Sequence, residues 1–210
     1  LVFLLPEQPL DASLYQQLLQ LNFRRSAEQV YTPHCPSCQA CQSVRIAPAQ
    51  FRPSASQRRL LNKATRAGWH YQLADDCSGD YNAIFADYIR HKHADGSMFP
   101  PAPEQLHGML NCACLKVKVL KQFQLQKLVA VTIVDETADA FSAVYTFFSP
   151  DISNYSPGIL AILYLLQVSL ARQKNWLYLG YQIDSCQKMA YKAAFKPQQR
   201  FIQGQWHSFG

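Results

Sequence analysis

Residues 127–148 read KLVAVTIVDETADAFSAVYTFF, and this stretch indicates a sheet. Residues 127–135 and 140–148 are rich in β-branched and aromatic side chains, and a short polar segment separates them. A third run of the same kind, residues 114–119, precedes them. Short connections suit antiparallel neighbours, because parallel strands need a longer crossover. We therefore predict three consecutive antiparallel strands.

The residues that follow predict two helices around one more strand. Ser156, Pro157 and Gly158 place a capping serine and a first-turn proline at the start of a helix that should run to about Lys174. Because residues 159–170 are apolar nearly all round, we expect this helix to be largely buried. Residues 176–179 predict a buried strand, and a final helix over about 185–196 should end before Pro197.

Upstream of the strands the pattern is more irregular. We expect helices at 11–21, 54–67 and 80–92, extended chain at 23–31, a cysteine-bearing loop at 34–41, a strand at 43–46 and a loop at 94–103. The predicted class is a mixed α/β (α+β) fold in which helices cover one sheet. We predict two parts, a smaller cysteine-containing subdomain over residues 1–70 and a C-terminal domain over residues 71–210.

Composition and charge indicate a globular protein with a polyanionic partner. The chain has 210 residues, is 49% hydrophobic and carries a formal charge of +6 with only 16% charged residues. The basic residues are concentrated in acid-free stretches, namely 42–74, 106–134 and the segment after Asp184. Any one of these could be an ordinary solvated surface. Three together favour binding to a polyanion such as a nucleic acid.

Targeting signals and cysteine content favour the cytoplasm. The longest apolar block, residues 159–166, is far shorter than the roughly 20 residues that cross a bilayer. The opening LVFLLP has no basic flank, so we do not expect a secretory signal, although a start at Leu1 suggests that a true N-terminus is missing. Seven cysteines, an odd number, favour thiols or metal ligands over a disulfide framework.

The cysteine-bearing loop is a candidate metal site. Cys35, Cys38 and Cys41 follow one another at a spacing that zinc and iron–sulfur sites use. A fourth ligand would have to come from His34, Cys77 or a residue upstream of the chain. Three loop thiols without a metal are the alternative.

Aromatic strand ends beside an acid and basic residues form a second candidate site. Tyr145, Tyr178 and Tyr181 lie near predicted strand ends, where ligands commonly bind, and Asp184 could take or relay a proton there. Lys188, Lys192 and Lys196 recur every fourth residue, which on a helix would place three ammonium groups along one face. The adjacent Arg58 and Arg59 could grip a phosphate or a carboxylate.

Long motifs across the chain resemble a known family. They are YTPHCPSCQACQSVRI (31–46), FRPSASQRR (51–59), AVYTFFSPD (143–151), YLGY (178–181) and KMAYKAAFKP (188–197). In this order they closely resemble the bacterial members of the arginyl-tRNA protein transferase family, which include aspartate/glutamate leucyltransferases. Members of that family usually carry a further cysteine-containing segment ahead of the position where this chain begins.

The resemblance implies a transferase that moves an amino acid from a charged tRNA to the N-terminal amine of a protein in the N-degron pathway. It implies a fold similar to the N-acetyltransferase superfamily, with a largely antiparallel sheet. The partners would be aminoacyl-tRNA and acceptor proteins with N-terminal Asp or Glu. We expect no cofactor for the transfer itself, because an N-terminal amine with a pKa near ~7.7 is already partly deprotonated at neutral pH. Zinc or an iron–sulfur cluster at the cysteine loop is a separate expectation.

Roles follow for individual residues as hypotheses. We expect Asp184 to orient or deprotonate the amine, with Tyr145 and Tyr181 beside it as catalytic residues. The residues expected to bind tRNA or substrate are Arg45, Arg58, Arg59, Tyr178, Lys188, Tyr191, Lys192 and Lys196. Leucine is the favoured donor amino acid and arginine the alternative. Two alternative functions belong to other classes of protein: a non-catalytic RNA-binding module and an acyl-coenzyme A dependent acetyltransferase.

Overall fold

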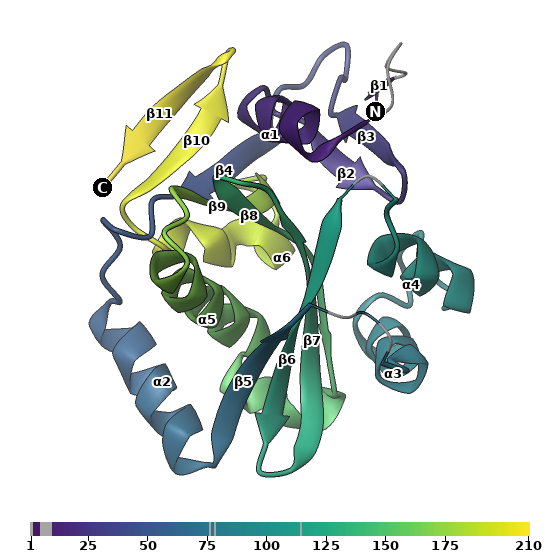
Figure 1. Ribbon diagram of the computed structural model, residues 1–210, viewed down its shortest axis with the longest axis vertical. Helices are drawn as coiled ribbons and strands as arrows, with labels where there is room; N and C mark the ends of the chain where they lie inside the picture. The colour runs from purple at the N-terminus through teal and green to yellow at the C-terminus, as the bar shows by residue number, and fades with distance from the viewer. Residues whose placement is uncertain (1, 5–9, 76, 78, 114) are drawn as a thin grey trace.

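The computed structural model describes residues 2–4, 10–75, 77, 79–113 and 115–210 (Figure 1). The helices are α1 (Ala12–Gln20), α2 (Ala55–Arg66), α3 (Asn82–Lys92), α4 (Pro103–Leu110), α5 (Pro157–Ala171) and α6 (Gln187–Ala190), with 3-10 helices η1 (Pro150–Tyr155) and η2 (Tyr191–Ala194). The strands are β1 (Val2–Leu4), β2 (Arg24–Ser26), β3 (Gln29–Thr32), β4 (Gln42–Ile46), β5 (Trp69–Ala74), β6 (Lys116–Gln124), β7 (Lys127–Glu136), β8 (Ala140–Phe148), β9 (Trp176–Gln182), β10 (Gln198–Ile202) and β11 (Gln205–Phe209).

One eight-stranded sheet organises the molecule, in the order β11-β10-β4-β9-β8-β7-β6-β5. Its neighbouring strands are antiparallel except for β8 and β9, which run parallel. Helices α2 and α5 lie on one side of the sheet, and α3 and α4 lie on the other (Figure 1). Strands β1, β3 and β2 form a separate small sheet beside α1.

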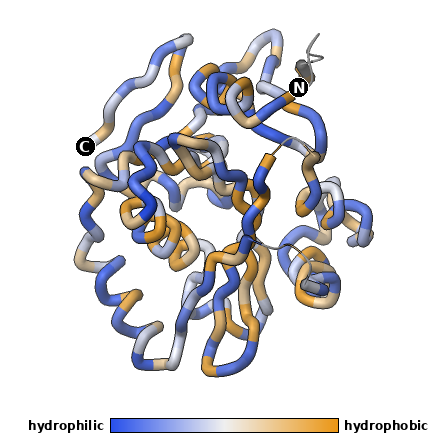
Figure 2. The backbone as a smooth tube through the Cα atoms, viewed as in Figure 1, coloured by the Kyte–Doolittle hydropathy of each residue, from blue (hydrophilic) through white to orange (hydrophobic). Residues whose placement is uncertain are grey.

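Hydrophobic clusters fill the layers between the helices and the sheet. One of them joins α5 to the strands through buried residues such as Leu160, Leu163 and Phe141. A second lies under α3 and α4, where Phe85, Ile89 and other apolar side chains pack on β6, β7 and β8. Figure 2 shows α5 as a mostly hydrophobic helix, in agreement with its predicted burial. The predicted fold class is confirmed: the sheet is mixed, largely antiparallel and covered by helices.

Local sequence signals explain where several helices begin. Asp11 caps α1 by accepting a hydrogen bond from the backbone N–H of Leu14. Ser54 and Gln57 form a reciprocal capping box at the start of α2. Pro157 occupies the first turn of α5 as predicted, but Ser156 does not cap it with its side chain. Ser156 instead has a left-handed φ of 49° that redirects the chain from η1 into α5.

The predicted helix over 185–196 is confirmed only in part. Only α6, residues 187–190, is α-helical, and the chain tightens into η2 at Tyr191. The reason is the burial of Phe195, which is fully buried and stacks on Phe51 in the main core. Gln198 Nε2 donates to the carbonyls of Lys192 and Phe195. These two hydrogen bonds close the turn that stands in place of the last helical turn.

Other differences concern elements that the sequence patterns did not indicate. Strand β5, helix α4 and the hairpin β10–β11 were not expected. The strand predicted at 114–119 extends to Gln124 and begins at Lys116, and Cys114 lies outside the described residues. Helix α5 ends at Ala171 rather than at about Lys174.

The boundary near residue 70 stays a prediction. Strand β4 lies inside the large sheet between β9 and β10, while β1–β3 remain separate from it. Across the part of the chain that the structure describes, we find no helix whose length and apolar character would let it span a membrane.

Candidate active site

A cavity of about 660 Å³ opens where β8 and β9 separate. The two strands pair only from Ala140–Trp176 to Ser142–Tyr178. Immediately beyond that pair, Gly180 has a left-handed φ of 75°, a conformation that side chains with a Cβ rarely adopt, and β9 turns away. The residues that follow the last pair on each strand, 143–146 and 179–181, line the cavity.

Six further segments contribute to the wall. They are α1, the β2–β3 hairpin, the end of α3, η1, the start of α5 and the α6–η2 segment. Ligands commonly bind in a crevice of this kind, where several elements converge beside the open ends of strands. The described residues that line the cavity include no Asp or Glu, while Arg24, Arg25, Lys92, Lys188 and Lys192 all contribute to it. The cavity is therefore cationic.

The structure brings together about half of the predicted site residues. Those that line the cavity are Tyr145, Tyr181, Lys188, Tyr191 and Lys192. The remaining predicted residues do not line it; they are Arg45, Arg58, Arg59, Tyr178, Asp184 and Lys196.

The lysines do not form the predicted row. Lys188 lies 3.4 Å from a carboxylate oxygen of Asp95. Lys196 donates to a main-chain oxygen of Gly210 at the C-terminal hairpin, and Lys192 donates to the carbonyl of Tyr181. Burial, followed by repulsion from Arg24, lowers the pKa of Lys192 to about 8. The three lysines do not share one face because the helix predicted to carry them is interrupted at Tyr191.

Asp184 lies outside the cavity and has partners of its own. Its side chain is 63% exposed and accepts from Arg200 Nη1 at 2.9 Å and from Gln182 Nε2 at 2.7 Å. These contacts join the end of β9 to β10. The role of Asp184 in handling a proton stays a prediction.

The phenols of the cavity are hydrogen-bond donors rather than bases at neutral pH. Burial raises the pKa of Tyr88 to about 12 and also raises the pKa of Tyr145 and Tyr181. Tyr181 donates its hydroxyl to the carbonyl of Asn22 at 2.7 Å, which anchors β9 to the turn between α1 and β2. Tyr145 and Tyr88 meet edge to face at 6.3 Å between ring centroids.

Arg24 and Arg25 are functional candidates that the sequence analysis missed. Both lie on β2, are 5% exposed and line the cavity. The sequence does show two consecutive arginines in the segment 23–31, which is predicted to be extended. Neighbouring side chains on a regular strand point to opposite faces, so the pattern by itself did not indicate that both arginines would be buried and line one cavity.

The three arginines that were predicted to bind tRNA or substrate have different surroundings. The Arg45 guanidinium is held between two indole rings, 3.8 Å from the centroid of Trp176 and 4.0 Å from that of Trp206. It also donates to Gln199. This arginine therefore supports the packing of β4 against β9 and β10. Arg58 and Arg59 are exposed on α2.

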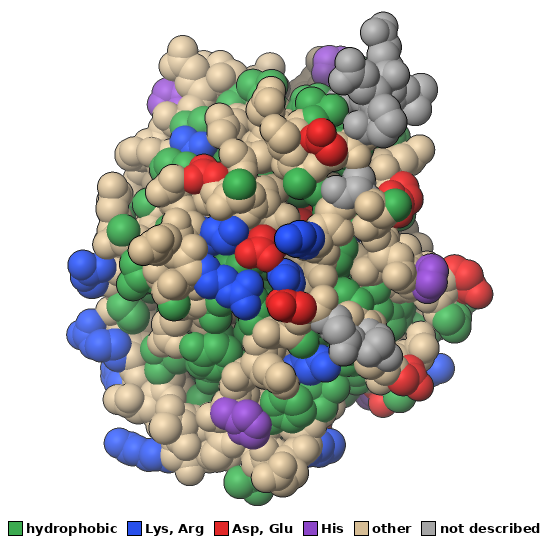
Figure 3. All heavy atoms as spheres, in the orientation of Figure 1, with side chains coloured by type: hydrophobic (Ala, Val, Ile, Leu, Met, Phe, Trp, Pro, Cys, Tyr) green, Lys and Arg blue, Asp and Glu red, His purple; other side chains and the backbone are tan. Residues whose placement is uncertain are grey.

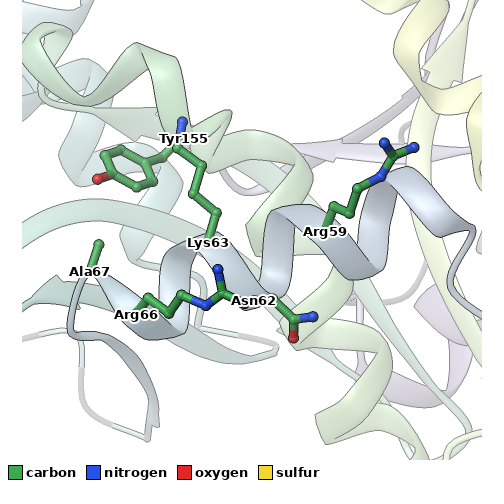
Figure 4. A pocket seen from close by; sticks show the side chains of 6 residues that line it. All are labelled: Arg59, Asn62, Lys63, Arg66, Ala67 and Tyr155. Atoms are coloured by element: carbon green, nitrogen blue, oxygen red, sulfur yellow. The ribbon is translucent and has the colours of Figure 1, made fainter.

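Helix α2 presents a basic face. Arg58, Arg59, Lys63 and Arg66 are exposed on it, and within the described ranges no acid pairs with any of them. Figure 4 shows Arg59, Lys63 and Arg66 around a hollow beside Tyr155. Lys63 reaches over the Tyr155 ring and donates to the carbonyl of Asn154. In Figure 3 basic side chains follow the left edge, where Figure 1 places α2.

Acids from elsewhere in the chain pair with two of the four lysines in the basic stretch at 106–134. Lys118 lies 2.6 Å from Asp75 and 3.2 Å from Glu136, and Lys127 lies 3.6 Å from Asp151. Figure 3 likewise shows acidic and basic side chains interspersed near the centre of its face. The acid-free stretch in sequence is therefore not an acid-free surface, because the sheet brings distant acids beside its lysines.

The cysteine loop does not supply a complete metal site from the described residues. Cys35 and Cys38 are exposed on a short turn, and Cys41 is partly buried. Burial, with proximity to Cys35 and Cys38, raises the pKa of the Cys41 thiol. No group of three or more His, Cys, Asp or Glu side chains among residues 2–4, 10–75, 77, 79–113 and 115–210 is arranged to hold an ion. Zinc or an iron–sulfur cluster stays a prediction.

Two solved structures have a fold similar to that of this chain. The structure of L-PGS from Bacillus licheniformis superposes with a TM-score of 0.59 at 12% identity. A C-terminal DUF2156 domain from Agrobacterium fabrum gives 0.60 at 14% identity. Each match covers 80% of this chain and 58% of the other, less than two thirds of its length. At such low identity the likeness concerns the fold alone.

Comparisons with sequences are more specific. An aspartate/glutamate leucyltransferase from Aeromonas hydrophila is 39% identical over 206 residues, covering 98% of this chain and 86% of the relative. One from Vibrio cholerae is 42% identical over 192 residues, covering 91% and 82%. The family model for the N terminus of arginine-tRNA-protein transferase matches residues 1–59, and that for its C terminus matches residues 80–202. The chain therefore belongs to the arginine-tRNA-protein transferase family.

Proposed function

We propose that this protein transfers leucine from leucyl-tRNA to the α-amine of proteins that begin with Asp or Glu. The observation that carries the proposal is the cationic, acid-free cavity at the separation of β8 and β9. Its acceptor would bring a negative charge, and its donor side chain would be uncharged. Relatives that are 39–42% identical over nearly the whole chain carry the name aspartate/glutamate leucyltransferase, which supports the same conclusion.

The donor amino acid follows from the chemistry of the wall. Apolar side chains cover one part of the cavity and are suited to a leucine side chain; they are Ala143, Phe148, Ile159, Ile162 and Leu179. An arginine donor would place its guanidinium against these apolar side chains, and the described residues that line the cavity offer it no carboxylate partner. Burying an ion without a partner costs several kcal/mol even after relaxation of the surroundings. Arginine is therefore the poorer donor.

The reaction needs little from the protein beyond positioning. The neutral amine attacks the ester carbonyl carbon, a C–N bond forms, and the bond to the ribose oxygen breaks. The proton lost by the amine ends on that leaving hydroxyl, directly or through water. Because an α-amine has a pKa of about 7.7–8.0, a strong base is not required. Holding amine and ester together can supply most of the rate, and the Tyr88 and Tyr145 hydroxyls and the Lys192 ammonium can donate to the developing oxyanion.

The donor preference is tested with the full chain and an acceptor peptide that begins with Asp. We expect leucyl-tRNA to be used at least about 100-fold better than arginyl-tRNA, as a cost of roughly 3 kcal/mol or more for burying an unpaired guanidinium implies. Acetyl-coenzyme A should give no product. Mass spectrometry of the peptide gives the mass of each added group. Arginylation that equals leucylation would contradict the assignment of the donor.

The basic face of α2 is the proposed contact for the tRNA backbone. Replacing Arg59 and Arg66 together with Gln should weaken binding of leucyl-tRNA and reduce the slope of log K against log salt by up to about 2, since each phosphate contact contributes about 1. A filter-binding series over salt concentration measures this. Arg90→Gln is the matched control, because Arg90 is exposed on α3 and paired with Asp87. An unchanged slope in the double variant would place the tRNA elsewhere.

The cytoplasm is the compartment proposed for this activity. Charged tRNA is present there, and N-terminal modification of proteins that are to be degraded through the N-degron pathway would take place beside it.

A further inference from the structure

The two consecutive arginines on β2 differ in how their guanidinium groups are partnered. Arg25 Nε and Nη2 bind both oxygens of Asp135 at 2.7–3.0 Å, and its remaining donors reach the carbonyls of Ala27 and Met109. Arg24 uses only Nη1, which donates to the carbonyl of Phe23 at 2.6 Å and to that of Leu19 at 3.4 Å. Its Nε and Nη2 atoms are buried and have no hydrogen-bond partner among the described residues.

The surroundings of Arg24 supply no counter-charge. Its guanidinium lies over the rings of Tyr178 and Tyr181, at 5.0 and 5.5 Å from the ring centroids. The buried carboxylate of Asp135 is occupied by the neighbouring Arg25. Buried donors without partners are costly, and folded proteins rarely keep them without a use. The fork formed by Nε and Nη2 therefore has the chemistry of an unfilled anion site.

We propose that Arg24 is the residue that binds the side-chain carboxylate of the acceptor's N-terminal Asp or Glu. This inference rests on the proposed function and names the specificity residue within it. Nε and Nη2 lie on one edge of the guanidinium, the edge that pairs with the two oxygens of a carboxylate. Lys192 lines the same cavity and adds a second positive charge.

Burial favours a small carboxylate over a tRNA phosphate. Arg24 is 5% exposed, and a backbone phosphodiester carries a ribose on each side. An aspartate side chain is narrow enough to enter the cavity end first. Tyr31 and Tyr181 both line this part of the cavity, with ring centroids 6.0 Å apart. Tyr181 is anchored to Asn22, so the partly exposed Tyr31 ring is the one expected to shift when the carboxylate reaches Nε and Nη2.

The test compares acceptors that differ only in charge. Peptides beginning with Asp or Asn are assayed with leucyl-tRNA, using the wild-type chain, Arg24→Gln and Arg24→Lys. For the wild type, kcat/KM for the Asp peptide should exceed that for the Asn peptide at least 100-fold. Arg24→Gln should reduce kcat/KM for Asp at least 100-fold and leave that for Asn within about threefold. Arg24→Lys, which keeps the charge but not the fork, should lie between them.

Binding of leucyl-tRNA and the unfolding transition are measured on the same variants, and Arg90→Gln again serves as the surface control. An unchanged Asp-to-Asn ratio in both Arg24 variants would overturn the inference, and so would an equal loss for both peptides together with weaker tRNA binding. If Arg24→Gln does not fold, the ratio in Arg24→Lys decides alone. A wild-type protein that leucylates neither peptide would instead refute the proposed function, so the two failures are distinguishable.

Discussion

Replacing Asp135 with alanine is expected to lower the free energy of unfolding by about 3–5 kcal/mol, because it leaves a buried guanidinium without its counter-charge. The Asp135 side chain is fully buried. It accepts from Arg25 Nε and Nη2, and from the hydroxyl of Tyr15 at 3.0 Å. All three groups would lose their partner at once.

The position of this ion pair explains why the effect should reach the active site. Asp135 lies on β7 of the large sheet, and Arg25 lies on β2 of the β2–β3 hairpin. Arg25 also donates to Met109 on α4, so one side chain joins three elements. Loss of these contacts of Arg25 would displace the preceding residue, Arg24, and with it one wall of the cavity.

Urea denaturation followed by circular dichroism measures the change. Asp151→Ala is the control, because its pair with Lys127 is exposed on both sides and should contribute no more than about 1 kcal/mol. A loss below about 1 kcal/mol in Asp135→Ala would mean that the hairpin is held mainly by its apolar contacts around Tyr15, Leu19 and Val30.

The sheet could be predicted because its signals are local. The β-branched runs at 127–135 and 140–148 became β7 and β8, and the apolar helix beginning near Ser156 became the buried α5. Capping residues such as Ser54 placed the start of α2. In each of these elements the burial of side chains and the preference of the backbone favour the same structure.

Elements that depend on distant contacts were not predictable in the same way. The spacing of Lys188, Lys192 and Lys196 suits a helix, but the burial of Phe195 against Phe51 overrides it. Strand pairing decides which charges remain available, so Lys118 is neutralised by Asp75 and Glu136 from other parts of the chain.

Only the part of the candidate site that follows from local sequence signals could be predicted. Tyr145 and Tyr181 follow from the rule that ligands bind at strand ends. The hairpin residue Arg24 reaches the cavity only because β2 is fastened to the large sheet through Arg25 and Asp135. A periodicity within one segment carries no information about such a contact between segments.

Lys192→Met should make the protein more stable and less active. Burial holds the pKa of Lys192 at about 8, below the value of 10.5 for an exposed lysine. Below pH 8 the folded protein therefore carries a buried ammonium that the unfolded chain would keep in water. Between pH 8 and 10.5 the unfolded state binds more protons, so stability from this residue rises with pH across that window. Removing the charge should stabilise the protein at pH 7 by roughly 1–3 kcal/mol, after the loss of the bond to the Tyr181 carbonyl.

Activity should change in the opposite direction, because the same ammonium contributes to the positive charge of the cavity. The charged or titratable groups that share the cavity with it, besides the tyrosines, are Arg24, Arg25, Lys92, His93, Cys186 and Lys188. In the wild type, kcat/KM for an Asp-bearing acceptor should rise as the amine deprotonates and fall above about pH 8, as Lys192 loses its proton. The variant should show kcat/KM at least about 10-fold lower at pH 7 and no alkaline fall with this pKa. A profile of kcat/KM against pH, together with thermal unfolding at pH 7, separates the two effects. Lower stability with an unchanged alkaline limb would show that Lys192 serves packing alone, whereas a gain in stability with lost activity would identify a charge that the fold tolerates for the sake of its substrate.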